Sequence, residues 1–111
     1  MLVQFTVNPL GETHFSKDVA QMMKILEDAD VEFCLGPMAT AVEGDWKEVM
    51  PAIHRCHEAM LEQHPRVITT ITIDDRKEQP HHLNEIVPIV EKYLGHKAGR
   101  AERRHLVVEL Q

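Results

Sequence analysis

Hydrophobic and polar residues alternate at the start of the chain, and this pattern predicts a half-buried strand over residues 2–7. Val3, Phe5 and Val7 would lie on one face of that strand, with polar side chains on the other. The sequence Asn8-Pro9-Leu10-Gly11 is rich in turn-forming residues and is expected to end it. One sheet face is therefore predicted to be covered by a core.

Apolar residues recur at helical spacing in three later segments. The first predicted helix covers residues 16–30, with Ser16 as its N-cap. A second helix is expected to begin near Asp45, which would cap it, and Pro51 is expected to bend or delay that helix. The same spacing predicts a third helix over residues 82–95.

The remaining apolar segments indicate further strands. Residues 31–35 and 38–43 are short extended runs separated by Gly36-Pro37, so they predict a hairpin. Residues 66–73 are rich in β-branched side chains and give the strongest strand pattern in the chain. Residues 105–110 could form a short last strand.

This order of elements predicts an α+β fold, a ferredoxin-like βαββαβ sandwich with an additional C-terminal helix and a possible short final strand. Residues 1–111 are expected to form a single domain. The second sheet face would be left open, and its side chains, among them Ile68, Thr70 and Thr72, are too apolar for full exposure. We therefore expect a homo-oligomer that uses this face or the strand edges.

Composition narrows the class of function. Hydrophobic residues make up 43% and charged residues 27% of the chain, and the net charge is −6. These values are typical of a globular protein and disfavour a nucleic-acid partner. No apolar run approaches the roughly 20 residues of a membrane span, and no secretory signal is expected. Cys34 and Cys56 are predicted to be reduced core thiols, which favours a cytoplasmic location.

Catalytic and metal-binding patterns are weak. His54 and His57 lie three residues apart on the predicted second helix, but no third ligand has motif spacing, so we predict no metal site. No phosphate-binding loop or serine-nucleophile motif occurs, and Asp74 and Asp75 would point to opposite sheet faces. We predict no catalytic residue and no cofactor. A small enzyme or metal protein that uses these four residues is the least favoured hypothesis.

The stretch 36–46, GPMATAVEGDW, offers a different chemistry. Thr40 supplies a hydroxyl and Glu43 a carboxylate, while Phe33 on the preceding strand supplies a flat apolar surface. These residue types would suit a heteroaromatic ligand through stacking and hydrogen bonds to its ring edge. The same residues also fit a turn, a short strand and a capped helix with no ligand.

A set of short motifs in a fixed order extends this interpretation. From about residue 3 to residue 95 the chain resembles the small thiamine-binding, YkoF-like family of ferredoxin-like proteins. The motifs that carry the resemblance are Pro9-Leu10-Gly11, Ser16-Lys17 with Val19-Ala20, Met38 with Thr40, Glu43-Gly44-Asp45-Trp46, Glu48-Val49-Met50, His57-Glu58, and Arg66-Val67 leading to Ile73-Asp74-Asp75-Arg76.

The resemblance implies a non-enzymatic protein, dimeric or tetrameric, that binds thiamine or its hydroxymethylpyrimidine moiety. By position it implies ligand contacts from Ser16, Phe33, Met38, Thr40 and Glu43. Composition and charge already predict neither a membrane nor a nucleic-acid partner.

An alternative follows from two positions of the same motifs. The family often has Tyr where Phe33 stands and Gly where Ala39 stands. A structural or regulatory homo-oligomer that has lost ligand binding is therefore the second hypothesis.

Overall fold

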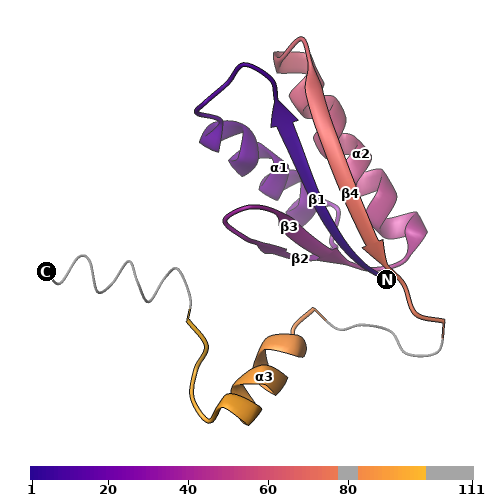
Figure 1. Cartoon of the computed structure of the whole chain (residues 1–111). Coiled ribbons are helices and arrows are strands. Elements are labelled where there is room, and N and C mark those ends of the chain that lie inside the picture. The colour runs from indigo at the N-terminus through magenta and orange to yellow at the C-terminus, as the bar shows by residue number, and fades with distance from the viewer. Residues whose placement is uncertain (78–82, 100–111) are drawn as a thin grey trace, which may run out of the picture.

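The computed structural model describes residues 1–77 and 83–99, which form a four-stranded antiparallel sheet with strand order β2-β3-β1-β4 and three helices. Helices α1 and α2 pack against each other on one face of the sheet (Figure 1). The predicted ferredoxin-like fold is confirmed, whereas residues 105–110 lie outside the described part of the chain. The elements are β1 (Leu2–Pro9), α1 (Ser16–Asp28), β2 (Glu32–Leu35), β3 (Thr40–Glu43), α2 (Trp46–Gln63), β4 (Val67–Asp74) and α3 (Ile86–Leu94).

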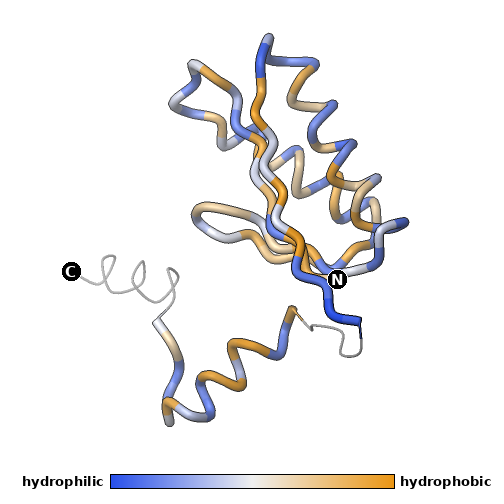
Figure 2. Tube along the Cα trace, turned by 45° about the vertical axis from the view of Figure 1, so that its right-hand side comes forward, coloured by the Kyte–Doolittle hydropathy of each residue, from blue (hydrophilic) through white to orange (hydrophobic). Residues whose placement is uncertain are grey.

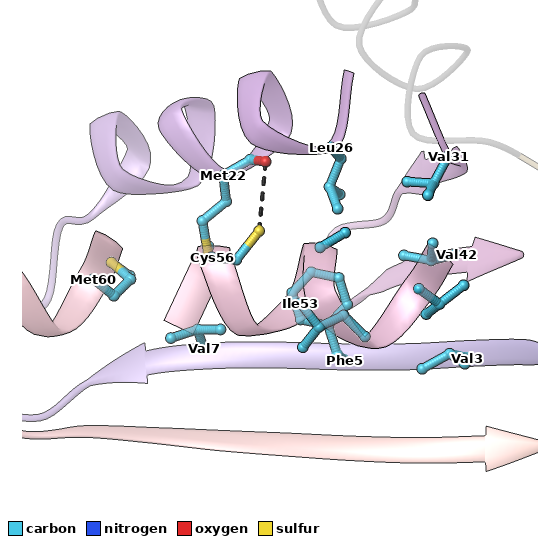
Figure 3. Close-up of a cluster of buried hydrophobic side chains, with 12 residues drawn as sticks. Val3, Phe5, Val7, Met22, Leu26, Val31, Val42, Ile53, Cys56 and Met60 are labelled. Atoms are coloured by element: carbon cyan, nitrogen blue, oxygen red, sulfur yellow. Dashed lines mark hydrogen bonds between the residues drawn. The ribbon is translucent and has the colours of Figure 1, made fainter. Parts of the chain in front are cut away.

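The core lies between the sheet and the two helices. Val3, Phe5 and Val7 of β1 are buried, as their alternation predicts, and they face Leu26 of α1 and Ile53 of α2 (Figure 3). Removing this apolar surface from water is the main force that holds the sheet and the two helices together.

The two cysteines occupy opposite environments. Cys56 is fully buried, and its Sγ lies 3.7 Å from the main-chain oxygen of Met22, to which it donates (Figure 3). Burial raises the pKa of this thiol to about 11, and the charge of Arg55 only partly opposes the effect. Cys34 is exposed, so the prediction of two core thiols is wrong for this residue. Cys34 pairs with Ala41 on the face of the sheet that the helices leave open.

The helix ends show where local capping rules hold. Asp45 caps α2 as predicted, because its Oδ1 accepts a hydrogen bond of 3.0 Å from the Glu48 amide. The prediction that Ser16 caps α1 is wrong: Phe15 occupies the N-cap position and Ser16 is the first helical residue. Helix α2 runs without interruption through Pro51.

The other sheet face and α3 expose apolar side chains. Ile68 on β4 is 46% exposed, and Thr70 and Thr72 beside it are exposed too. Helix α3 buries none of its residues, although most of them are apolar (Figure 2). None of the helices in residues 1–77 and 83–99 is long and apolar enough to cross a membrane.

Candidate functional site

A pocket of about 170 Å³ lies beside α1, where the β2–β3 hairpin stops pairing with β1. We call it the hairpin pocket. Its floor is the second half of β1, its roof is α1, and its outer wall is the hairpin tip. Its lining includes Val7, Phe15, Val19, Met38 and Thr40.

A second pocket, of about 420 Å³, adjoins the first and is called the loop pocket. It is bounded by the loop before α1, the first turns of α1 and the end of β2. Phe15, Val19, Leu35 and Gly36 line both pockets, so these side chains and this glycine stand between them. The two pockets form one bipartite concave surface, mostly apolar, of the type that small molecules occupy.

The hairpin tip is shaped by Gly36. Its amide donates a hydrogen bond of 2.9 Å to the Ala39 carbonyl, which closes a two-residue turn made by Pro37 and Met38. A Cβ atom on Gly36 would lie only 2.7 Å from that carbonyl oxygen. Glycine is therefore required for the close approach of the two backbone segments that border the pockets.

Thr40 is the only buried polar residue in the described part of the chain, with 6% of its surface exposed. It pairs with Phe5 of β1, so the two side chains share the face that the helices cover. Its hydroxyl has no hydrogen-bonding partner among residues 1–77 and 83–99. A buried hydroxyl without a partner is costly, and this one lines the hairpin pocket.

The first turn of α1, which borders the loop pocket, is held by a hydrogen bond. His64, at the end of α2, lies 3.0 Å from the carboxylate of Asp18 in that turn, and both side chains are only 13% exposed. Glu12, in the loop before α1, lies 3.9 Å from the other ring nitrogen of His64. These contacts hold the loop and the start of α1 against the end of α2.

The structure brings some of the predicted ligand contacts together and separates others. Met38 and Thr40 line the hairpin pocket, and Ser16 lines the adjoining loop pocket. Phe33 is half-buried and packs against the core on the helix-covered face, but it borders neither pocket. Glu43 lies three residues after Thr40 and therefore faces the opposite side of the sheet. One of its carboxylate oxygens accepts a hydrogen bond of 3.2 Å from the Leu83 amide.

Sequence reasoning missed Phe15, which lines both pockets. The available signal was weak: Phe15 is an aromatic residue in an otherwise polar loop, directly before the predicted helix. Trp46, the only Trp of the chain, begins α2 and lines neither pocket.

The histidine pair on α2 has separate partners. His57 shares a hydrogen bond of 2.6 Å with the Thr69 hydroxyl, and His54 lies 3.3 Å from the Glu58 carboxylate. Within the described residues no group of three or more His, Cys, Asp or Glu side chains is arranged to hold a metal ion.

Comparison with known proteins identifies the family. The sequence model of the thiamine-binding protein family matches residues 3–91. The chain belongs to this family. Membership supports a small-molecule-binding role, and the match covers both pockets and all of the sheet except Leu2.

Relatives of the same family occur in distant organisms. The chain is similar to a UPF0045 protein of Staphylococcus xylosus, with 34% identity over 85% of this chain and 94% of the relative. It is similarly close to a UPF0045 protein of Bacillus subtilis, with 34% identity over 84% of this chain and 96% of the relative. A hypothetical protein of Methanocaldococcus jannaschii has the same fold, with a TM-score of 0.71, 25% identity, and coverage of 85% of this chain and 94% of that one.

Proposed function

We propose that this protein is a non-enzymatic binding protein for thiamine or its hydroxymethylpyrimidine moiety, and that the hairpin and loop pockets receive the ligand. Family membership supports the ligand class. The observation that carries the proposal is the buried Thr40 hydroxyl, which lines the hairpin pocket without a partner in the described residues. A ligand with a polar ring edge would supply the missing hydrogen bond.

The ligand has one part for each pocket. Thiamine consists of two linked rings, and the two pockets are separated by Phe15 but share their walls. In our proposal the pyrimidine occupies the hairpin pocket beside Thr40 and Met38. The second ring extends toward Ser16 in the loop pocket, and Phe15 packs against the bend between the rings.

Isothermal titration of the full chain with thiamine and with hydroxymethylpyrimidine tests this proposal. We expect saturable heat with one ligand per chain. The matched variant is Thr40→Val, which keeps the shape of the side chain and removes only the hydroxyl. It should bind roughly tenfold more weakly, because one hydrogen bond in a buried site is lost.

The stability of the same variant provides a control. Removing a buried hydroxyl without a partner should leave the ligand-free protein as stable as the wild type, or more stable. Absence of heat and of a melting shift at millimolar ligand would refute the proposal. It would favour the alternative, a structural or regulatory homo-oligomer without a ligand.

The protein is also proposed to act as a cytoplasmic homo-oligomer. Apolar side chains exposed on β4 and α3 support self-association, because exposed apolar surface often marks an interaction site. Two free cysteines support a reducing compartment.

A further inference from the structure

The pocket exists because β1 is longer than its neighbour. β1 pairs with β4 along its full length, from Leu2 to Pro9. On the other side β3 pairs only with the stretch from Leu2 to Phe5. The second half of β1 therefore has a strand on one side and the hairpin pocket on the other.

Hydrogen bonds at the strand ends show which backbone groups face that pocket. The Leu10 amide donates to the Arg66 carbonyl at 3.0 Å, so even-numbered residues of β1 pair with β4. Odd-numbered residues consequently direct their N–H and C=O groups toward β3. Pro9, which has no N–H, falls on the same side, where the β1–β4 ladder does not need that donor.

Val7 is an odd-numbered residue of β1 that has no partner on β3. Val3 and Phe5 pair with Val42 and Thr40, but the hairpin turns away before it reaches Val7. The position opposite Val7 would fall on Met38, which belongs to the two-residue turn instead. In the described residues the N–H and C=O of Val7 thus face the hairpin pocket, next to the Thr40 side chain.

The surroundings make these two groups strong recognition elements. Val7 is only 3% exposed, and the pocket wall beside it is largely aliphatic and aromatic. Buried backbone donors and acceptors nearly always find partners, and hydrogen bonds are stronger where water is excluded. The hairpin tip closes the outer side of the gap, so a compact molecule fits better than a peptide strand.

We propose that the Val7 backbone is a donor–acceptor edge that recognises a planar heterocycle with a ring nitrogen next to an exocyclic amino group, as in a 4-aminopyrimidine. The ring nitrogen accepts from the Val7 N–H, and the amino group donates to the Val7 C=O. This inference rests on the proposed function and specifies which ligand edge the pocket reads. Selectivity for the aminopyrimidine edge would then come from the N–H and C=O of Val7, which no sequence motif identifies.

The test uses the ¹⁵N-labelled full chain, hydroxymethylpyrimidine, and its analogue with methyl in place of the 4-amino group. Methyl and amino groups have nearly the same size, so the analogue keeps the shape, removes the donor and weakens the ring nitrogen as an acceptor. We expect the parent to shift the Val7 amide resonance and to slow its hydrogen exchange at least tenfold. The Thr6 amide, which pairs with β4, serves as an internal control and should change little. The methyl analogue should bind at least tenfold more weakly.

The outcomes separate this inference from the proposed function. Binding of the parent with an unchanged Val7 amide, or with equal affinity for the methyl analogue, would overturn the inference and leave the binding function standing. Binding of neither compound would overturn both. A Val7 amide that responds to an added extended peptide but not to the pyrimidine would show that the edge pairs with a strand instead.

Discussion

At the residue scale, Glu43 and Thr40 belong to the same short strand, β3, but their side chains lie on opposite faces of the sheet. Thr40 faces the helices and the hairpin pocket, whereas Glu43 faces the open side of the sheet and accepts from the Leu83 amide. We therefore assign Glu43 to the attachment of the segment that leads into α3. Its predicted role as a ligand contact would need the ligand, or a second protomer, to reach that face.

Glu43→Gln tests the assignment. The amide keeps an oxygen acceptor for Leu83 but removes the negative charge. We expect thiamine affinity to stay within about twofold of the wild type, in contrast to the tenfold loss expected for Thr40→Val. Titration calorimetry of the two variants side by side makes the comparison. A loss of tenfold or more in Glu43→Gln would restore Glu43 as a ligand contact.

Cys56 links stability to alkaline pH. Its pKa is raised from the ordinary 9.0 to about 11 in the folded protein, because burial disfavours the thiolate. The folded state therefore retains a proton that the unfolded chain loses, and this stabilising contribution is complete below pH 9. It disappears as the pH rises from 9.0 to about 11, and the total loss is about 2–3 kcal/mol.

Urea unfolding at several pH values between 8 and 11 measures this effect. The comparison is with Cys56→Ala, which lacks the buried thiol and whose stability should therefore fall less steeply with pH. Parallel pH profiles for the two proteins would contradict the assignment. Exposed Cys34 provides an independent check, since it should react rapidly with a thiol reagent that leaves Cys56 unmodified in the folded protein.

The local patterns of the sequence predict the burial of individual residues well and the site only in part. Alternation correctly places Val3, Phe5 and Val7 in the core. The same alternation, applied to residues three apart, separates Thr40 from Glu43. The role of Phe15 in lining both pockets could not be predicted from local patterns. Its position depends on how the loop before α1 meets the end of β2, and these segments are distant in the sequence.

At the element scale, the hairpin turn borders both pockets through Gly36. Gly36→Ala would place a Cβ 2.7 Å from the Ala39 carbonyl oxygen, closer than side-chain atoms normally approach. The turn must open to relieve this contact. We expect a loss of about 1–3 kcal/mol in the free energy of unfolding, together with weaker ligand binding.

Chemical denaturation and titration calorimetry of Gly36→Ala measure the two effects. Gly99→Ala is the matched control, since a Cβ at Gly99 meets no atom within 4 Å. That control should be nearly neutral in both measurements. If Gly36→Ala were equally neutral, the close approach of Gly36 to Ala39 would not determine the shape of the pockets.

The elements themselves were largely predictable because each carries a strong local pattern. The three helices and four strands of the described chain all appear near their expected positions. The ends were less predictable: α1 begins at Ser16 without a side-chain cap, and β1 extends to Pro9. A strand end depends on its neighbours, and β1 continues because β4 pairs with it along the whole length.

At the scale of the whole molecule, α3 is the element that most clearly needs a partner. It buries no residue, and Ile86, Ile89 and Val90 are each about half exposed. A nine-residue apolar helix is not stable alone in water, so its stability must come from packing. We attribute that packing to the proposed homo-oligomer.

Ile89→Glu tests this attribution. A charge on the apolar surface of α3 would be costly to bury, so we expect the oligomer to dissociate or weaken at least tenfold. Light scattering coupled to size exclusion reports the mass. Lys92→Gln, on the same helix, changes the net charge by the same amount and should leave the mass unchanged. An oligomer that tolerates Ile89→Glu would place the interface elsewhere.

Strand β3 pairs with only the first half of β1, and this has a consequence for how the fold can diversify. The hairpin pocket is a vacancy in a sheet, created where one strand stops before its neighbour. Two additional hairpin residues would supply Val7 with a strand partner and fill the space, while the core beneath would need no repacking. The length of one surface loop can therefore switch a binding protein into a purely structural one, without any change in the residues that make the fold stable.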